Sequence, residues 1–145
     1  ALAMKKHEHV LDVGTGSGYM AALLGAHADH VWSIEIDPQL ADAARENLRR
    51  AGVTNVSVQT GNGLSGLAAH APFDVIMVSG AVAEVPGVLL DQLKPGGRLF
   101  AITGAAPAME AAVYTRTEKG VQRRAVFETV VAPLSEAEPA PAFAF

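Results

Sequence analysis

Residues Val10–Gly18 read VLDVGTGSG, and this stretch is the most informative part of the sequence. Its first four residues are typical of a buried strand, apart from the acid Asp12, and three glycines then follow at alternate positions. Because glycine has no Cβ, a chain can turn there and bring its backbone close to a ligand. The stretch therefore predicts a strand, a ligand-binding loop and a helix that begins near Tyr19.

The spacing of the glycines separates two classes of nucleotide-like ligand. A dinucleotide loop reads G-x-G-x-x-G, and its third position must be small so that helix and strand can pack closely. Gly14 and Gly16 fit that pattern, but its third position falls on bulky Tyr19, and the last glycine comes one residue early, at Gly18. An acid followed by three alternate glycines is typical of S-adenosylmethionine (SAM) methyltransferases. The loop thus favours SAM over a nicotinamide dinucleotide, and methyl transfer over redox chemistry.

Composition narrows the class of protein. A length of 145 residues suits one domain, residues 1–145, and 50% hydrophobic with 18% charged residues is typical of a soluble α/β protein. The net charge of -4 gives no basic surface for nucleic acid, and no apolar run is long enough to span a membrane. The sequence has 0 cysteines, which excludes disulfides, thiolate metal sites and a cysteine nucleophile. We expect a cytoplasmic protein.

The beginning of the chain suggests a missing part. It reads ALAMKK, without an initiator methionine and almost directly before the first predicted strand. Leu2 followed by Lys5 and Lys6 is typical of the tail of a helix. We therefore expect that an upstream segment is absent from this sequence.

Strand and helix patterns alternate along the chain. Apolar runs predict strands at 9–13, 30–36, 56–60, 73–78 and 98–103, and helical patterns lie at 18–25, 38–51, 64–69 and 88–93. Two more strands, at 111–116 and 124–131, flank a turn and predict an antiparallel edge hairpin. This order predicts a Rossmann-like α/β fold, a mostly parallel twisted sheet with helices on both faces.

The helix at 38–51 has the clearest boundaries. Asp37 is a good N-cap, Pro38 suits the first helical position, and Gly52 is a stop signal. We expect its buried face to carry Leu40, Ala44, Leu48 and Ala51.

Parallel sheets bind ligands beyond the carboxyl ends of their strands, so the residues there are the candidates. The loop after the first strand consists of Gly14, Thr15, Gly16, Ser17 and Gly18. We expect its backbone amides to face the amino-acid end of SAM. Asp12 lies just before the loop, where its carboxylate would orient the loop or meet the ammonium group of the ligand through water. The alternative is a glycine turn without a ligand.

The next two strand ends carry the other candidates for cofactor binding. Glu35 ends the second strand, and an acid there accepts hydrogen bonds from two ribose hydroxyls in nucleotide-binding folds. The alternative is a solvated residue at a strand end. We expect Ile36 to lie against adenine or in the core. After the third strand, the side-chain oxygen of Asn62 would accept from the adenine amino group and the backbone of Gly63 would meet a ring nitrogen, unless this is an ordinary Asn-Gly turn.

The fourth strand leads to Ser79-Gly80-Ala81, where a methyl acceptor would be presented. Ser79 is either a catalytic contact or an ordinary loop hydroxyl. The sequence lacks an Asn/Asp-Pro-Pro-aromatic tetrapeptide, which counts against methylation of the amino groups of bases or glutamine. Methyl transfer from a sulfonium needs mainly alignment, and a carboxylate acceptor is ionised near neutral pH. A site without an evident base is therefore compatible with carboxyl methylation.

The histidines and the tryptophan do not suggest a further site. No metal-ligand spacing relates His7, His9, His27, His30 and His70, so we expect no metal. Trp32 is expected in the core rather than as a stacking platform.

With these strand ends laid out, the chain resembles the protein-L-isoaspartate O-methyltransferase family. The matching segments are Val10–Tyr19, Val31–Glu35 and Leu90–Leu99, with a weaker match over Phe127–Leu134. The resemblance implies a SAM-dependent repair enzyme that methylates the misplaced α-carboxyl of L-isoaspartyl residues in damaged proteins. The ester can then close to a succinimide and reopen as aspartate. The resemblance also implies that Gly14, Gly16, Glu35 and the Asn62-Gly63 turn bind the cofactor.

The sequence departs from the family pattern in three places. The Thr-x-Ser-x-Pro substrate loop upstream of the first strand has no counterpart, Asn62 replaces the usual aspartate, and Ser79-Gly80-Ala81-Val82 replaces a Thr-Ala-Ala-type strand end. The residues expected to bind the cofactor therefore match the family pattern better than those expected to bind the substrate. Two alternatives remain open: a methyltransferase of a small molecule such as a corrinoid precursor, and a SAM-binding or partner-binding module without turnover. An NAD-dependent oxidoreductase ranks last because of Tyr19.

Overall fold

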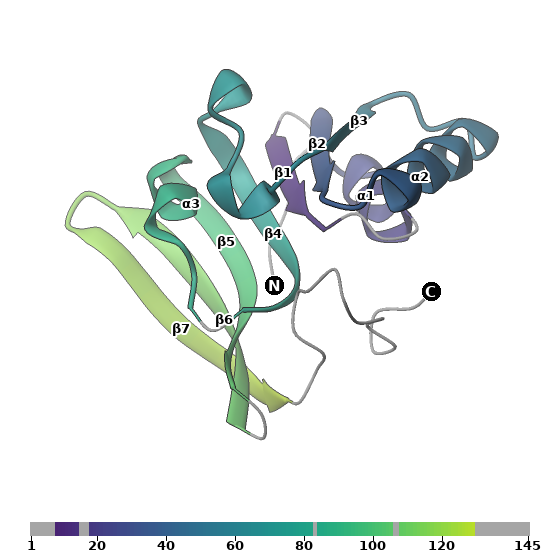
Figure 1. The fold of residues 1–145 in the computed structure, drawn as a ribbon. Helices are drawn as coiled ribbons and strands as arrows, with labels where there is room; N and C mark the ends of the chain where they lie inside the picture. The colour runs from purple at the N-terminus through teal and green to yellow at the C-terminus, as the bar shows by residue number, and fades with distance from the viewer. Residues whose placement is uncertain (1–7, 15–17, 83, 106–107, 130–145) are drawn as a thin grey trace.

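The computed structural model describes residues 8–14, 18–82, 84–105 and 108–129. Within these residues, the chain alternates between strands and helices or 3₁₀ turns before it ends in a hairpin (Figure 1). The elements are β1 (His9–Val13), α1 (Tyr19–Gly25), β2 (His30–Glu35), α2 (Pro38–Arg50), β3 (Val56–Thr60), η1 (Gly63–Ser65), η2 (Ala68–His70), β4 (Phe73–Val82), α3 (Gly87–Asp91), β5 (Leu93–Ala105), β6 (Ala108–Thr117) and β7 (Gly120–Thr129).

The seven described strands form one sheet in the order β3-β2-β1-β4-β5-β6-β7. The first five pair in parallel, and β6 and β7 are added as an antiparallel hairpin at one edge. From β1 the chain moves outward to β3 and then returns to the other side of β1 to form β4. The switch point of strand order therefore lies between β1 and β4, where such sheets bind ligands. The predicted fold class is confirmed.

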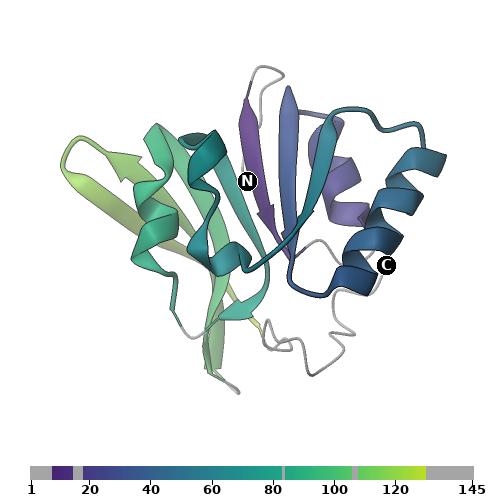
Figure 2. The same ribbon diagram turned by 45° about the horizontal axis from the view of Figure 1, so that its top comes forward.

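The two faces of the sheet have separate cores, because side chains alternate along each strand. Val10, Val31 and Val75 point to the face that α1 covers. Leu11 and Ile76 belong to a larger cluster on the opposite face, with Leu89 of α3, and Leu64 and Leu67 pack against it. Figure 2 shows the same ribbon from a second direction, with α3 beside the sheet. Helices or 3₁₀ turns thus lie on both faces, as predicted.

Helix α2 begins as predicted but buries a different face. The side chain of Asp37 accepts a hydrogen bond from the backbone N of Gln39 at 2.8 Å, and Pro38 opens the helix. The buried residues are Ala41, Ala44 and Leu48, whereas Leu40 is 44% exposed and Ala51 is also exposed. The prediction was therefore right for Ala44 and Leu48 and wrong for Leu40 and Ala51, and Ala41 is buried instead.

Several boundaries differ from the predicted ones. The predicted helix at 64–69 is two 3₁₀ turns, and β4 extends four residues beyond 78. The predicted Lys-Pro-Gly-Gly turn lies inside β5, where the register with β4 jumps from Phe73–Leu93 to Val75–Arg98. A Cβ at Gly97 would lie 2.8 Å from the carbonyl oxygen of Lys94, so glycine is needed for this irregular strand start.

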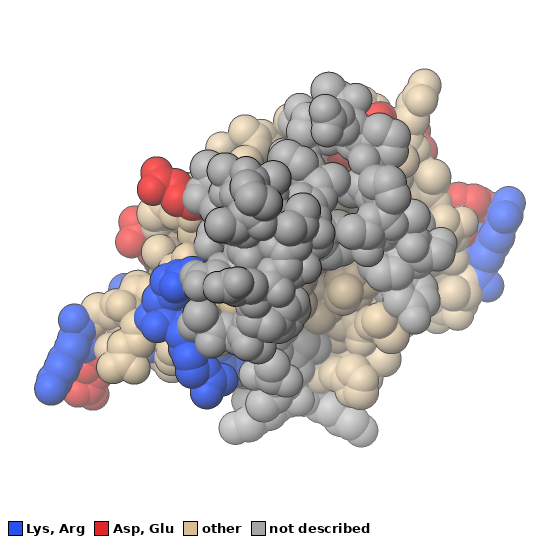
Figure 3. Space-filling view, turned by 90° about the horizontal axis from the view of Figure 1, so that it is seen from below, with Lys and Arg blue, Asp and Glu red and all other residues tan. Residues whose placement is uncertain are grey.

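The described surface carries charges of both signs. In Figure 3, Lys and Arg side chains form separate groups with Asp and Glu side chains near them. Charged side chains of α2 form ion pairs: Arg45–Asp42 at 2.7 Å, and Arg49 and Arg50 with Glu46 at 2.6 and 3.0 Å. None of the described helices is both long and apolar enough to cross a bilayer.

Candidate functional site

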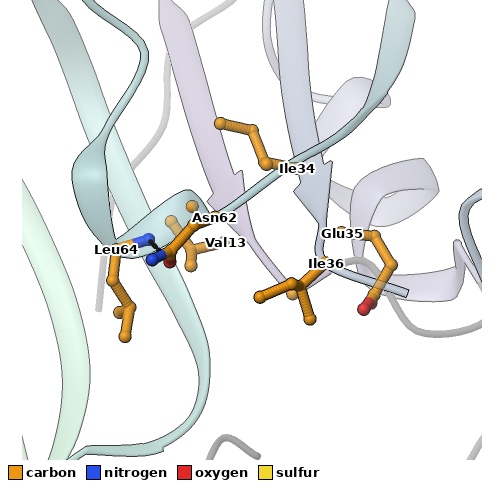
Figure 4. A pocket seen from close by; sticks show the side chains of 8 residues that line it. Val13, Ile34, Glu35, Ile36, Asn62 and Leu64 are labelled. Carbon is orange, nitrogen blue, oxygen red and sulfur yellow. Dashed lines mark hydrogen bonds between the residues drawn. The ribbon is translucent and has the colours of Figure 1, made fainter. Parts of the chain in front are cut away.

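A hollow opens at the carboxyl ends of β1, β2 and β3 (Figure 4). It is open to solvent, and its volume of about 320 Å³ includes part of that solvent. We call it the site hollow and define it by its lining residues, Val13, Gly14, Ile34, Glu35, Ile36, Asn62, Gly63 and Leu64. Five predicted site residues thus lie together: Gly14, Glu35, Ile36, Asn62 and Gly63. Sequence reasoning missed Val13, Ile34 and Leu64, since nothing in an apolar strand marks which residues line a ligand site.

Glu35 is held at the junction of β2 and α2. Its side chain is largely buried, with the residue 7% exposed, and its Oε2 accepts a hydrogen bond from the backbone N of Asp37 at 3.0 Å. This contact orients the carboxylate beside the start of the helix. The neighbouring Ile36 is 42% exposed at the rim of the site hollow, so it is not a core residue.

Asn62 closes its own turn. Its Oδ1 accepts a hydrogen bond from the backbone N of Leu64 at 3.0 Å, which caps η1 (Figure 4). The Asn-Gly turn that sequence analysis offered as the alternative is therefore present. An amide oxygen has two lone pairs, so this oxygen retains the capacity to accept a second hydrogen bond.

Glycines bring the loop and the 3₁₀ turn close to β1 and α2. Gly14 and Gly18 have φ angles of 88° and 89°, in the left-handed region that L side chains rarely adopt. A Cβ at Gly18 would lie 3.3 Å from the backbone oxygen of Ala44, and one at Gly63 would lie 2.7 Å from Val13 Cγ1. Of the predicted loop residues, Thr15, Gly16 and Ser17 lie outside the described residues.

Asp12 is completely buried between strands β2 and β4. Its Oδ2 accepts from the hydroxyl of Ser33 at 3.0 Å, and its Oδ1 accepts from the hydroxyl of Ser79 at 3.0 Å. Burial raises the pKa of Asp12 to about 7; the two hydroxyls partly offset this rise, and the charge of Glu35 adds to it. Asp12 is therefore a buried carboxyl that joins three strands.

Ser33 was missed from the sequence, although a signal exists. It lies in the apolar strand β2 two residues before Glu35, so alternation places both on the same face. Ser79, the candidate for a catalytic contact, is partly buried, and its hydroxyl hydrogen is committed to Asp12.

Trp32 packs in a cluster of rings on the face opposite Asp12. Its ring lies 4.4 Å from that of His30, 4.8 Å from that of His70 and 5.9 Å from that of Phe73, measured between centroids. Trp32 is also packed against the larger core cluster and does not line the site hollow. It is a packing residue, as expected.

Comparison with known families supports the resemblance. A profile of the family described as "Protein-L-isoaspartate(D-aspartate) O-methyltransferase (PCMT)" matches residues 1–138. The chain belongs to this family. Its sequence is 46% identical over 121 residues to the protein-L-isoaspartate O-methyltransferase of Methanoculleus marisnigri, covering 83% of this chain and 55% of the relative. The chain therefore spans about half the length of that curated PCMT relative.

Solved structures of PCMT and of other methyltransferases share the fold. A protein-L-isoaspartate O-methyltransferase matches with a TM-score of 0.82 and 28% identity, over 92% of this chain and 44% of that one. A SAM-dependent methyltransferase from Thiobacillus denitrificans, solved with S-adenosyl-L-homocysteine, matches with a TM-score of 0.61 and 26% identity. That match covers 70% of this chain and 44% of the other. The Rossmann-like methyltransferase fold and the PCMT resemblance predicted from the sequence are both confirmed.

Proposed function

We propose that the chain binds SAM in the site hollow and that the protein methylates the α-carboxyl of L-isoaspartyl residues in damaged proteins. One observation carries this proposal: in a chain of the PCMT family, the ends of three parallel strands bring Gly14, Glu35 and Asn62 to one hollow. The methyltransferase from Thiobacillus denitrificans was solved with S-adenosyl-L-homocysteine, which is SAM without its methyl group.

The residues of the site hollow fit the adenosine half of SAM. The oriented carboxylate of Glu35 suits two ribose hydroxyls, and the apolar side chains of Ile36 and Leu64 suit the faces of adenine. The second lone pair of Asn62 Oδ1 suits the adenine amino group.

We assign the amino-acid half of SAM to the loop Gly14–Gly18, with Asp12 behind it. Bound SAM carries its methyl group on a positively charged sulfonium sulfur, which is already activated to leave as a thioether. The task of the chain is then to hold and align the reactants. The acceptor carboxylate is ionised near pH 7 and needs no general base, so no catalytic base is assigned.

The methyl acceptor is expected to bind beside the end of β4, the part of the strand from Ser79 onward. We propose that its partners are proteins and peptides with isoaspartyl residues, and that residues 1–145 act as one domain. We place the protein in the cytoplasm, in keeping with a sequence of 0 cysteines.

Cofactor binding is tested by calorimetric titration with SAM and with NAD. We expect binding to SAM alone; binding to NAD alone would overturn the proposal. Glu35→Gln should weaken SAM binding by at least ~1 kcal/mol, because hydrogen bonds to a charged acceptor are lost. Glu118→Gln, in the exposed turn before β7, is the matched control and should leave the affinity unchanged. Equal affinities for both variants would remove Glu35 from the site.

The reaction is tested with two peptides that differ only in one linkage. Radiolabelled methyl transfer from SAM is measured to an isoaspartyl peptide and to the same peptide with ordinary aspartate. The protein is assayed as this chain and with any native sequence that flanks it. We expect labelling of the isoaspartyl peptide only. SAM binding without labelling of that peptide would favour a methyltransferase of another substrate or a binding module.

A further inference from the structure

Strand β4 loses its regular pairing where it approaches the acceptor side. Its parallel register with β1 runs from Val10–Val75 to Val13–Val78 and stops there. Its register with β5 shifts between Met77 and Ala81, which pair with Phe100 and Ile102. Three residues of β4, 78–80, therefore lie opposite a single residue of β5. Main-chain pairing alone defines the path of this segment poorly, because a bulge of this kind disrupts the ladder and bends the strand.

The hydroxyl of Ser79 ties this irregular segment to the centre of the sheet. It donates to Asp12 Oδ1 at 3.0 Å, across 67 residues of sequence. Asp12 is completely buried, so water does not compete for its oxygens. A hydrogen bond to a buried carboxyl is among the stronger ones in proteins, because the dielectric around it is low.

The other carboxyl oxygen of Asp12, Oδ2, contacts a part of the sheet with regular pairing. It accepts from Ser33 at 3.0 Å, and Ser33 lies directly opposite Asp12 in the regular ladder of β1 and β2. Five register pairs already hold that part of the sheet. The two hydroxyls thus bind the same carboxyl at the same distance, but only Ser79 belongs to a segment that the ladder leaves irregular.

We infer that Asp12 and Ser79 are positioning residues: they fix residues 79 and 80 of β4, which lack regular pairing, and so set the end of the strand at the correct place for the methyl acceptor. This inference rests on the proposed function. Asp12 lies two residues before Gly14, which lines the site hollow, so one strand would position both the cofactor and the acceptor side. Alignment of the two reactants is the main demand of the reaction, and a misplacement of about 1 Å can cost about a hundredfold in rate.

The pair Ser79→Ala and Ser33→Ala tests this inference, because each variant removes one hydroxyl from the same carboxyl. We expect Ser79→Ala to raise KM for the isoaspartyl peptide by about tenfold, the size of one buried hydrogen bond. The Kd for SAM should stay within about twofold. Ser33→Ala should change neither constant, although both variants lose some stability. Ser79→Thr keeps a hydroxyl and should restore KM.

Hydrogen–deuterium exchange gives a readout that does not depend on turnover. The amides of residues 79 and 80 should exchange faster in Ser79→Ala than in wild type, and at the wild-type rate in Ser33→Ala. If Ser79→Ala does not fold, Ser79→Cys replaces the hydroxyl with a weaker donor of similar size. Its KM and its exchange rate should both be higher than those of wild type.

Two results would overturn the inference. One is an equal effect of the two alanine variants on KM and on exchange, which would mean a merely structural carboxyl. The other is an unchanged KM and unchanged exchange in Ser79→Ala. If the wild-type protein methylates no isoaspartyl peptide, the proposed function fails, and the exchange data still decide whether Asp12 holds the end of β4.

Discussion

At the scale of single residues, Asp12 is the most unusual group in the described part of the chain. It is an acid with 0% exposure, and its pKa is raised to about 7, chiefly by burial. Two hydroxyls face it, from Ser33 and Ser79, and the carboxylate of Glu35 is the ionisable neighbour that adds to the rise. Near neutral pH both protonation states of this carboxyl are therefore populated, whereas an ordinary exposed carboxyl is ionised.

This pKa predicts how stability depends on pH. The folded value of about 7 lies above the ordinary value of 3.8, so between these pH values the folded state holds a proton that the unfolded state releases. Stability should therefore fall as pH rises through this window, by roughly 1.4 kcal/mol for each pH unit. In Asp12→Asn, which cannot titrate, this slope should be absent. Urea unfolding at pH 4.5, 6 and 8 measures the difference between the two proteins.

Asp42→Asn provides the control for the pH series. Asp42 is largely exposed on α2, in an ion pair with Arg45, so its loss should not remove the slope. A difference between Asp12→Asn and wild type that stays constant from pH 4.5 to 8 would contradict the assigned role of the buried proton.

At the scale of elements, the short turn η1 shapes the floor of the site hollow. The sequence pattern predicted a helix at 64–69, but the structure has two 3₁₀ turns instead. Asn62 caps the first turn through Leu64, which draws Gly63 against Val13 of β1. The apolar pattern of residues 64–69 predicts a helix. The contact of Gly63 with Val13 of β1 instead requires a tighter turn that begins with glycine.

Gly63→Ala should therefore harm the site. The new Cβ would lie 2.7 Å from Val13 Cγ1 and 3.4 Å from Ile34 Cβ, both of which line the site hollow. The turn must shift, which we expect to cost about 1 to 3 kcal/mol of stability and to weaken SAM binding. Thermal unfolding and calorimetric titration measure the two effects.

Gly61→Ala is the matched variant two residues earlier. Its Cβ would meet only Ile34 Cγ2, at an ordinary contact distance of 3.7 Å. We expect stability and SAM affinity close to wild type. Equal losses in the two variants would show that the close approach at Gly63 is not the cause.

At the scale of the whole molecule, an ion pair joins the start of β1 to β5 across the sheet. Arg98 donates from two nitrogens to the carboxylate of Glu8, at 3.1 and 3.2 Å, and 90 residues separate the two in sequence. Glu8 is almost completely buried, and the Arg98 side chain is 20% exposed. A bidentate pair in such surroundings restricts how β1 and β5 lie relative to each other.

Glu8→Ala should destabilise the protein by about 3 kcal/mol, because it leaves the arginine charge mostly buried without this carboxylate. Asp42→Ala removes the partner of an exposed arginine and should change stability by less than about 1 kcal/mol. Urea unfolding of both variants at one pH measures the comparison. If the two variants unfold at the same urea concentration, the pair at Glu8 does not stabilise the sheet.

Although the bounds of β4 and β5 differ from the predicted ones, the sequence alone was enough to predict the order of the elements and the glycine turn after β1. These follow from local rules: alternation for strands, helical spacing with caps, and glycine where the backbone turns. For the same reason Glu35 and Asn62 could be predicted to lie together at the ends of neighbouring strands, where both line the site hollow. The resemblance to the PCMT family also rested on such contiguous segments.

Which polar groups meet follows from the three-dimensional packing of the strands. Asp12, Ser33 and Ser79 lie on three strands, and their contact depends on the register of β1 with β2 and with β4. Register is set by the packing of both sheet faces at once, so it is not encoded in any one segment. The same holds for Leu40, which a helical pattern predicted as buried and which the position of α2 over the sheet leaves exposed.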